Sequence, residues 1–222
     1  AIFSLLSDET SVISNYLEAE DTLNSLAIAS KLGAKVEKID GKYHITPPAQ
    51  ISSAKSILEC GNSGTAMRIY MGLLAGCDGF YVLSGDEYLN ERPMRRVADP
   101  LIKIGAKIDG RDKANKAPIA IRGGNLEYFN YDSAIASAQV KSALILAGLC
   151  ANGCKLSEPE LSRDHSERML KGMGADISYE DGKIIVKPLG SKKLKPLIMS
   201  VPNDPSSCFF YAVAAAITPG AR

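Results

Sequence analysis

The stretch Gly61–Thr65, with the sequence GNSGT, places two glycines and three small polar residues directly before an apolar helical segment that carries Arg68. A helix that begins here exposes unpaired backbone N–H groups and the positive end of its dipole, and the arginine adds a guanidinium. Such a junction favours an anion, either a phosphate or a carboxylate. Asn, Ser and Thr are also ordinary N-cap residues, so the stretch indicates a ligand site only in company with others.

Two more segments carry polar residues at expected helix starts. Arg92 precedes Pro93, which suits the first position of a helix, and a cation just outside a helix start opposes the dipole unless an anion lies nearby. Ser137, Gln139 and Lys141 lie in an otherwise apolar helix, where polar side chains must be hydrogen-bonded. Each has a purely structural alternative: Arg92 could be solvated, Ser137 could bond its own helix, and Gln139 could cap a neighbouring strand.

A fourth segment, 161–170, begins another expected helix, which either Ser162 or Asp164 would cap. We interpret Glu91 and Asp164 as helix-start or ion-pair residues. The sequence shows neither a pair of carboxylates nor a lysine in an arrangement suited to proton transfer. The chemistry indicated is therefore anion binding rather than acid–base catalysis.

The composition describes a globular chain with ample material for a core, because 45% of its 222 residues are hydrophobic and 23% are charged. The formal net charge is +1, from 26 Lys and Arg against 25 Asp and Glu. This balance argues against general binding of nucleic acid or of a membrane surface, which needs a basic excess. No apolar run approaches the ~20 residues of a membrane-spanning helix.

The cysteines are odd in number and lack the spacing of a disulfide framework, which indicates free thiols in a reducing cytoplasm. They are Cys60, Cys77, Cys150, Cys154 and Cys208. Both histidines, His44 and His165, lie far along the chain from the close pair Cys150 and Cys154. We therefore expect no metal site and no cofactor.

A threefold repeat organises the chain. Similar hexapeptides recur at intervals of about 70 residues: KLGAKV at 31–36, KIGAKI at 103–108 and GMGADI at 172–177. In each copy a glycine ends an apolar periodic helix and an extended hairpin follows. Two of the hairpins turn on Asp-Gly, at 40–41 and 181–182, which is the strongest short hairpin signal.

Upstream of each copy the pattern continues with a strand and a further helix, and leading strands are visible at 54–60 and 125–131. The unit is therefore βαβαββ, repeated over about 1–50, 51–124 and 125–196. The helices expected at 64–76 and 133–149 are apolar on most faces, so they should be buried. We predict an α+β domain, 1–196, with three units around a pseudo-threefold axis and helices inside. Residues 197–222 would add a strand and a helix that lead into a second domain.

In such a repeat the equivalent helix starts gather at one end of the domain. The four polar segments around residues 62, 92, 137 and 162 should therefore converge on one face. Taken together they predict a site for a polyanion, although each signal alone is weak. The first residues, 1–6, have the pattern of the middle of a helix, so we expect the chain to be part of a longer protein.

Four motifs then resemble one known family. GNSGTAMR, NERPM, SAQVKSALILAGL and SRDHSERML occur in the order and context of 5-enolpyruvylshikimate-3-phosphate synthases, which are 3-phosphoshikimate 1-carboxyvinyltransferases. The resemblance runs through essentially all 222 residues. It implies the inside-out α/β barrel of the enolpyruvyl transferases, with two domains of three βαβαββ units. It also implies transfer of the enolpyruvyl group of phosphoenolpyruvate to the 5-hydroxyl of shikimate 3-phosphate, a cytoplasmic step of aromatic amino acid biosynthesis.

The resemblance assigns residues to both substrates. The residues implied for phosphoenolpyruvate are Asn62, Gly64, Arg92 and Gln139. Those implied for shikimate 3-phosphate are Ser137, Ala138 through its backbone, Gln139 and Ser162. His165 stands where some relatives have a tyrosine, and its role is left open. Gly64 would leave room for glyphosate, which competes with phosphoenolpyruvate in this family, while Ile69 replaces a proline of many relatives.

The departures from the family are larger than these substitutions. A segment that supplies a Lys, a Ser and an Arg to the substrates should precede Ala1, and a second domain should supply the catalytic acid and base. The resemblance thus implies an inactive substrate-binding half whose partners are the two substrates and the second domain of the full-length chain.

Three alternatives remain at this point. UDP-N-acetylglucosamine enolpyruvyl transferases share the fold but should carry different motifs and a reactive loop cysteine. RNA 3′-terminal phosphate cyclases also contain βαβαββ units, but they should be basic and should bind nucleotides. The third alternative is a non-catalytic domain kept only for assembly.

Overall fold

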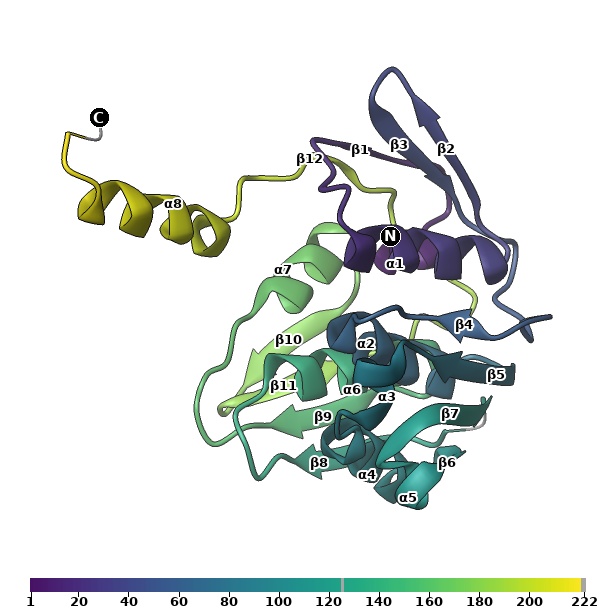
Figure 1. Ribbon diagram of the computed structural model, residues 1–222. Coiled ribbons are helices and arrows are strands. Elements are labelled where there is room, and N and C mark those ends of the chain that lie inside the picture. Colours follow the sequence, from purple (N-terminus) through teal and green to yellow (C-terminus); the bar gives the residue numbers. More distant parts are fainter. Residues whose placement is uncertain (125, 221–222) are drawn as a thin grey trace.

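The computed structural model describes residues 1–124 and 126–220, so Asn125 of the expected leading strand and the last two residues lie outside the described part (Figure 1). The described residues contain three four-stranded sheets of the same construction. Their orders are β12-β1-β3-β2, β4-β5-β7-β6 and β8-β9-β11-β10, and in each the first two strands are parallel and the others antiparallel. The predicted threefold repeat is confirmed.

The first sheet belongs to the shortest unit. Its elements are η1 (Phe3–Leu6), β1 (Ser11–Ser14), α1 (Glu20–Lys31), β2 (Lys35–Ile39) and β3 (Lys42–Thr46). The segment expected to continue a helix at 1–6 is a single turn of 3₁₀ helix. The β2–β3 turn has φ of 49° at Asp40 and 74° at Gly41, which is the type I′ geometry that the Asp-Gly pair predicts.

The second unit is the longest. It comprises β4 (Leu58–Glu59), α2 (Gly64–Gly76), β5 (Gly79–Ser84), α3 (Glu87–Glu91), α4 (Arg95–Lys103), β6 (Lys107–Gly110), α5 (Arg111–Ala114) and β7 (Lys116–Gly123). Its hairpin contains the pair Asp109-Gly110, but both residues belong to the end of β6 and the chain does not turn on them. The turn α5 instead passes through left-handed conformations, with φ of 49° at Asp112, 55° at Lys113 and 61° at Ala114.

The third unit contains β8 (Phe129–Asp132), α6 (Ala138–Cys150), β9 (Cys154–Ser157), α7 (His165–Gly172), β10 (Ile177–Glu180) and β11 (Lys183–Val186). Its Asp-Gly turn is again of the predicted type, with φ of 50° at Asp181 and 73° at Gly182. The helix α6 begins at residue 138 rather than at 133. Ser133 donates a local hydrogen bond to the carbonyl of Ile135 over 2.7 Å, an alternative to helical bonding that favours a turn.

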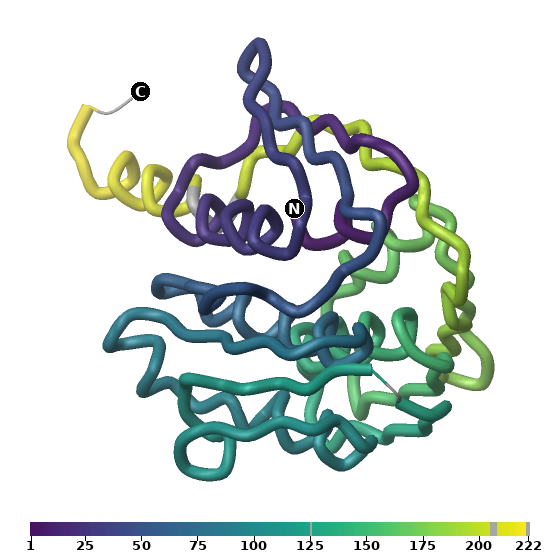
Figure 2. Tube along the Cα trace, turned by 90° about the vertical axis from the view of Figure 1, so that its right-hand side faces the viewer, coloured from purple at the N-terminus to yellow at the C-terminus, as the bar shows by residue number. Residues whose placement is uncertain are grey.

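The remaining elements are β12 (Ile198–Ser200) and α8 (Pro205–Ile217). β12 pairs in parallel with β1, in the place that β4 and β8 occupy in the other sheets. Figure 2 shows this yellow-green segment beside the purple start of the chain. A strand from beyond residue 196 therefore completes the first sheet, while the domain division at that residue stays a prediction. α8 extends away from the sheets with Phe209, Phe210 and Tyr211 exposed (Figure 1).

The two long central helices are buried between the sheets, as predicted. α2 and α6 pack against each other so closely that glycine is required on α2. A Cβ atom built on Gly72 would lie 2.2 Å from the carbonyl oxygen of Ala143, and one on Gly76 would lie 2.7 Å from that of Ala147. Such distances are far below van der Waals contact, so a side chain at either glycine would force the helices apart.

The described residues contain no group of three or more His, Cys, Asp or Glu side chains that could hold a metal ion. All five cysteines are free thiols. Within the described part, no helix is both long enough and apolar enough to cross a membrane.

Candidate anion-binding site

The N-terminus of α2 is built as the GNSGT motif predicts. Ser63 is the N-cap, and its hydroxyl accepts a hydrogen bond from the backbone N–H of Ala66 over 3.3 Å. The helix begins at Gly64. Asn62, just before the cap, donates its side-chain amide to Asp86 Oδ2 over 2.7 Å. The turn before the helix is thus fixed from both sides, which holds the first N–H groups of α2 in one orientation.

Arg68 lies one turn into α2 and connects three elements. Its Nη1 donates to Gln139 Oε1 over 3.1 Å, and its Nη2 donates to the carbonyl of Pro93 over 3.0 Å. Its buried Nε has no hydrogen-bond partner. Burial, followed by the nearby charges of Arg96 and Arg92, lowers the pKa of Arg68. The charges of Arg92 and Arg96 thus repel that of Arg68, and this repulsion favours an anion near Arg68.

Arg92 reaches the same point from another element. Its Nη2 donates to Asn62 Oδ1 over 2.5 Å, and its Nη1 donates to the carbonyl of Asn62 over 3.3 Å. The expected position of Arg92 before a helix start is wrong, because Arg92 caps the C-terminus of α3 and α4 begins only at Arg95. The short helix α3 escaped sequence analysis, although Asp86 caps it by accepting from the N–H of Leu89 over 2.7 Å.

Gly64 faces both guanidinium groups. A Cβ atom at this position would lie 3.0 Å from Nη1 of Arg68 and 3.6 Å from Nη1 of Arg92. The missing side chain therefore lets both guanidinium groups lie close against the start of α2. Among the described residues, no carboxylate forms an ion pair with Arg68 or Arg92. Their hydrogen-bond partners are neutral carbonyl and amide groups, which leave the positive charge for a ligand.

The N-terminus of α6 joins this cluster through Gln139. Besides accepting from Arg68, Gln139 donates its amide to Thr65 Oγ1 over 3.0 Å, so it bridges α6 and α2. The alternative that Gln139 caps a strand is wrong. Ser137 is the N-cap of α6, with its hydroxyl 3.5 Å from the N–H of Val140, and Ala138 is the first residue of the helix. The structural alternative for Ser137 is thus confirmed, and it leaves the hydroxyl proton free to be donated.

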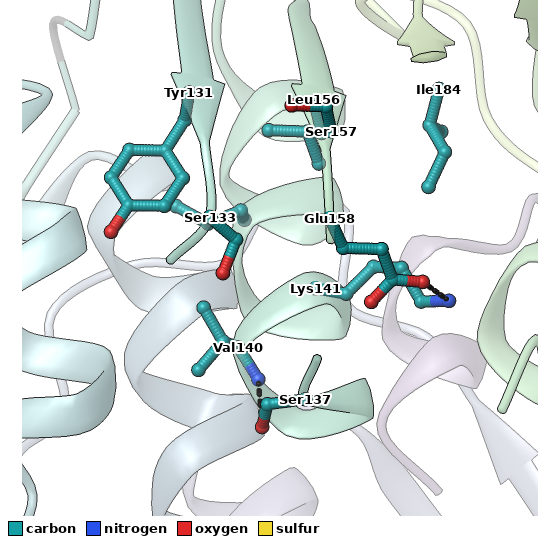
Figure 3. Close-up of a pocket in the computed structure, with 10 residues that line it drawn as sticks. Tyr131, Ser133, Ser137, Val140, Lys141, Leu156, Ser157, Glu158 and Ile184 are labelled. Carbon is teal, nitrogen blue, oxygen red and sulfur yellow. Dashed lines mark hydrogen bonds and ion pairs between the residues drawn. The ribbon is translucent and has the colours of Figure 1, made fainter. Parts of the chain in front are cut away.

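Ser162 lies near the next turn of α6 but is not a helix cap. Its hydroxyl donates to Glu158 Oε2 over 2.7 Å, and its N–H donates to Glu158 Oε1 over 2.9 Å. Its carbonyl accepts from Lys141 Nζ over 3.3 Å. The N-cap of α7 is Asp164, which makes no side-chain capping bond. Figure 3 shows Lys141 and Glu158 paired beside Ser137, in a small cavity also lined by Tyr131 and Ser133.

His165 faces a different cavity. This cavity is larger and mostly apolar, and Thr65, Ile69, Met169 and Met199 also line it. Glu91, interpreted from sequence as an ion-pair residue, forms ion pairs with Arg111 over 2.6 Å and with Lys116 over 2.5 Å, which confirms that interpretation.

The structure thus brings together Asn62, Gly64, Arg92 and Gln139, the set expected for one anion. Sequence analysis placed Arg68 in the motif but did not assign it to the site, and it missed Thr65 and Arg96. A usable signal existed for Arg68, because residues four apart in a helix lie on one face and Gly64 precedes Arg68 by that interval. Nothing local in the sequence indicates Arg96.

Fold and site together define a repeat domain with a cationic face at its helix starts. Comparison with known proteins agrees with the family resemblance of the sequence motifs. The family model for EPSP synthase (3-phosphoshikimate 1-carboxyvinyltransferase) matches residues 1–222. A 3-phosphoshikimate 1-carboxyvinyltransferase from Campylobacter fetus is 75% identical over the whole chain, and one from Campylobacter curvus is 61% identical. An EPSP synthase structure from Acinetobacter baumannii superimposes with a TM-score of 0.86 at 38% identity, covering 98% of this chain and 49% of that one.

The chain therefore belongs to the EPSP synthase family. The fold predicted from the motifs is confirmed, and the two related enzyme classes considered as alternatives are set aside. The chain spans 52% of the length of these two curated relatives, so it corresponds to about half of each.

Proposed function

We propose that this chain binds shikimate 3-phosphate and phosphoenolpyruvate for the transfer of the enolpyruvyl group to the 5-hydroxyl, with release of phosphate. The observation that carries the proposal is the convergence of Arg68, Arg92 and the start of α2 on the space beside Gly64, with only neutral groups as partners. Phosphoenolpyruvate carries a carboxylate and a phosphate, and this arrangement suits either group.

In this proposal Asn62, Gly64 and Arg92 bind phosphoenolpyruvate together with Arg68. Gln139 stands between the two substrates, since it already bonds Arg68 on one side and lies two residues after Ser137 on the other. The second set, Ser137, the backbone of Ala138, Gln139 and Ser162, binds shikimate 3-phosphate. Both ligands are highly anionic, and fixed cations and N–H groups offset their repulsion.

The reaction is an addition followed by an elimination. A proton must reach the methylene carbon of phosphoenolpyruvate, and another must leave the 5-hydroxyl of shikimate 3-phosphate. The acid and base for these steps are not among the residues assigned here. We assign them to a second domain of a longer chain, which would close over this face and exclude water. The relatives' greater length supports this division, and the five free cysteines support a cytoplasmic setting.

The proposal is tested by calorimetric titration with shikimate 3-phosphate, followed by phosphoenolpyruvate in the presence of the first ligand. Arg92→Ala should weaken binding of phosphoenolpyruvate about tenfold or more, the effect of losing a charge-assisted contact. Arg95→Ala is the matched control, because Arg95 is also an exposed arginine but pairs with Asp99 and Asp112. Equal affinities in the two variants would remove Arg92 from the site.

A negative result has a defined meaning as well. If neither ligand binds the unmodified chain at millimolar concentration, the proposal that this half holds the substrates by itself is wrong. If the chain turns over both substrates, the assignment of the acid and base to another domain is wrong.

A further inference from the structure

Lys141 is a buried lysine for which the proposed reaction has no use. Its side chain is 6% exposed, and its ammonium group lies 2.8 Å from Glu158 Oε1 and 2.8 Å from Glu167 Oε1. The third acceptor is the carbonyl of Ser162, 3.3 Å away. The three donors of the ammonium are thus matched by three acceptors. Well-packed apolar residues are often at least as stabilising as a buried ion pair, so stability alone does not account for this arrangement.

The carboxylates are as buried as the lysine. Glu158 is 7% exposed and Glu167 is 1% exposed. They come from different elements, because Glu158 directly follows β9 and Glu167 lies in α7. Lys141, from α6, therefore joins the two ends of the segment 158–167. This set, Lys141 with Glu158 and Glu167, is called the lysine cluster below.

Ser162 lies inside the loop that the lysine cluster closes. Each of its polar groups is bound to a member of that cluster: the hydroxyl and the N–H to Glu158, and the carbonyl to Lys141. Glu158 keeps Ser162 in place, and Lys141 keeps Glu158 in place. Since Lys141 lies one helical turn after the N-cap Ser137, the cluster also sets the position of Ser162 relative to Ser137.

We infer that Lys141 is a positioning residue for the phosphate of shikimate 3-phosphate, acting through Glu158 on Ser162. This inference extends the proposed function, which names Ser162 as a ligand but leaves its placement unexplained. When the phosphate binds, the Ser162 hydroxyl turns from Glu158 to a phosphate oxygen. The Glu158 carboxylate keeps its bonds to Lys141 and to the Ser162 N–H, so the loop does not move.

The first test uses the free protein and needs no ligand. Hydrogen exchange of the Ser162 amide reports its bond to Glu158. Lys141→Met should accelerate that exchange about tenfold relative to amides elsewhere in the chain. The control is Ser142→Ala, which removes the 2.6 Å hydroxyl contact between α6 and α7 at Ser166 but touches no group of Ser162. Unchanged exchange at Ser162 in Lys141→Met would overturn the inference.

The second test isolates the phosphate. The ratio of the affinities for shikimate 3-phosphate and for shikimate cancels any general damage to the pocket. Lys141→Met should reduce this ratio several-fold, as Ser162→Ala does, whereas Ser142→Ala should leave it unchanged. If Ser162→Ala lowers the ratio and Lys141→Met does not, the inference fails while the proposed function stands. If Ser162→Ala leaves the ratio unchanged, the assignment of Ser162 to the phosphate fails.

Lys141→Met leaves two buried carboxylates without a counter-charge and could prevent folding. The double variant Lys141→Met/Glu167→Gln keeps the formal charge of the cluster at −1 and leaves only one buried carboxylate, Glu158, without its counter-charge. Both bonds from Ser162 to Glu158 remain possible in it. Faster exchange at Ser162 and a reduced affinity ratio in the double variant are expected, and native values of both would refute the positioning role.

Discussion

Cations near the starts of α2 and α6 have partners of opposite kinds. At the start of α2, Arg68 and Arg92 donate only to amide and carbonyl oxygens, and no carboxylate among the described residues pairs with them. At α6, Lys141 is enclosed by two carboxylates. A cation held by neutral partners keeps its charge for a ligand, whereas one matched by buried carboxylates serves the structure. The partners of a cation, rather than the cation itself, distinguish binding from positioning.

The largest effect expected from this comparison is on stability. Lys141→Met should lower the free energy of unfolding by about 3–5 kcal/mol, because removing one partner leaves two buried, uncompensated carboxylates. Urea unfolding of the variant and of the unmodified chain measures the difference. A loss below about 1 kcal/mol is the range of exposed ion pairs. Such a value would show that the lysine cluster is solvated, and the proposed difference between Lys141 and the two arginines would be wrong.

The arginine part is sharpened by Arg68→Lys, which keeps the charge and alters the geometry. Lysine cannot reproduce the planar fork that bonds Gln139 and the carbonyl of Pro93 together. We expect phosphoenolpyruvate to bind about tenfold more weakly, with little change in stability. Calorimetry and thermal unfolding of the same sample provide both values. Full affinity would mean that charge alone suffices at this position.

Gly64→Ala tests the space between the two arginines. The added methyl would lie 3.0 Å from Nη1 of Arg68, so the guanidinium must shift by a few tenths of an ångström. The long arginine side chain can make this shift, and we expect only a several-fold loss of phosphoenolpyruvate affinity. Glyphosate should lose more, since the resemblance places it in the same space. Competition titrations of the two ligands in the variant determine whether this difference exists.

The smallest expected effect is a pH dependence from Glu158. Burial raises the pKa of Glu158, but the hydrogen bonds from Lys141 and Ser162 outweigh it and hold the pKa below its ordinary value of 4.5. A carboxyl whose pKa is lowered by folding stabilises the protein above the pKa of the unfolded chain, and this contribution disappears as the pH falls through the lowered pKa. Stability should therefore fall below pH 4.5, and Glu158→Gln should reduce the slope. Unfolding curves between neutral and acidic pH give both slopes.

Much of this protein follows from its sequence alone. Apolar periodicity, glycine stops and Asp-Gly turns act over a few residues, so they predicted the three units, both Asp-Gly hairpins and the buried helix α2. The same local order of motifs carried the family resemblance. Gly64 and Gln139 meet because the repeated units place the starts of α2 and α6 together, whereas Arg92 reaches them from the end of α3.

Only the tertiary structure decided which strands pair and which groups contact the cations of α2 and α6. The pairing of β12 with β1 joins residues almost two hundred positions apart, and no pattern near either strand indicates it. Arg68 and Lys141 looked alike in sequence, each a cation in an apolar helix. Long side chains take their role from groups that other segments bring within hydrogen-bond distance, here Gln139 at 3.1 Å for Arg68 and Glu158 at 2.8 Å for Lys141. Local sequence determines where a charged side chain lies along the chain. The packed fold determines whether that charge is already paired with a carboxylate of the protein.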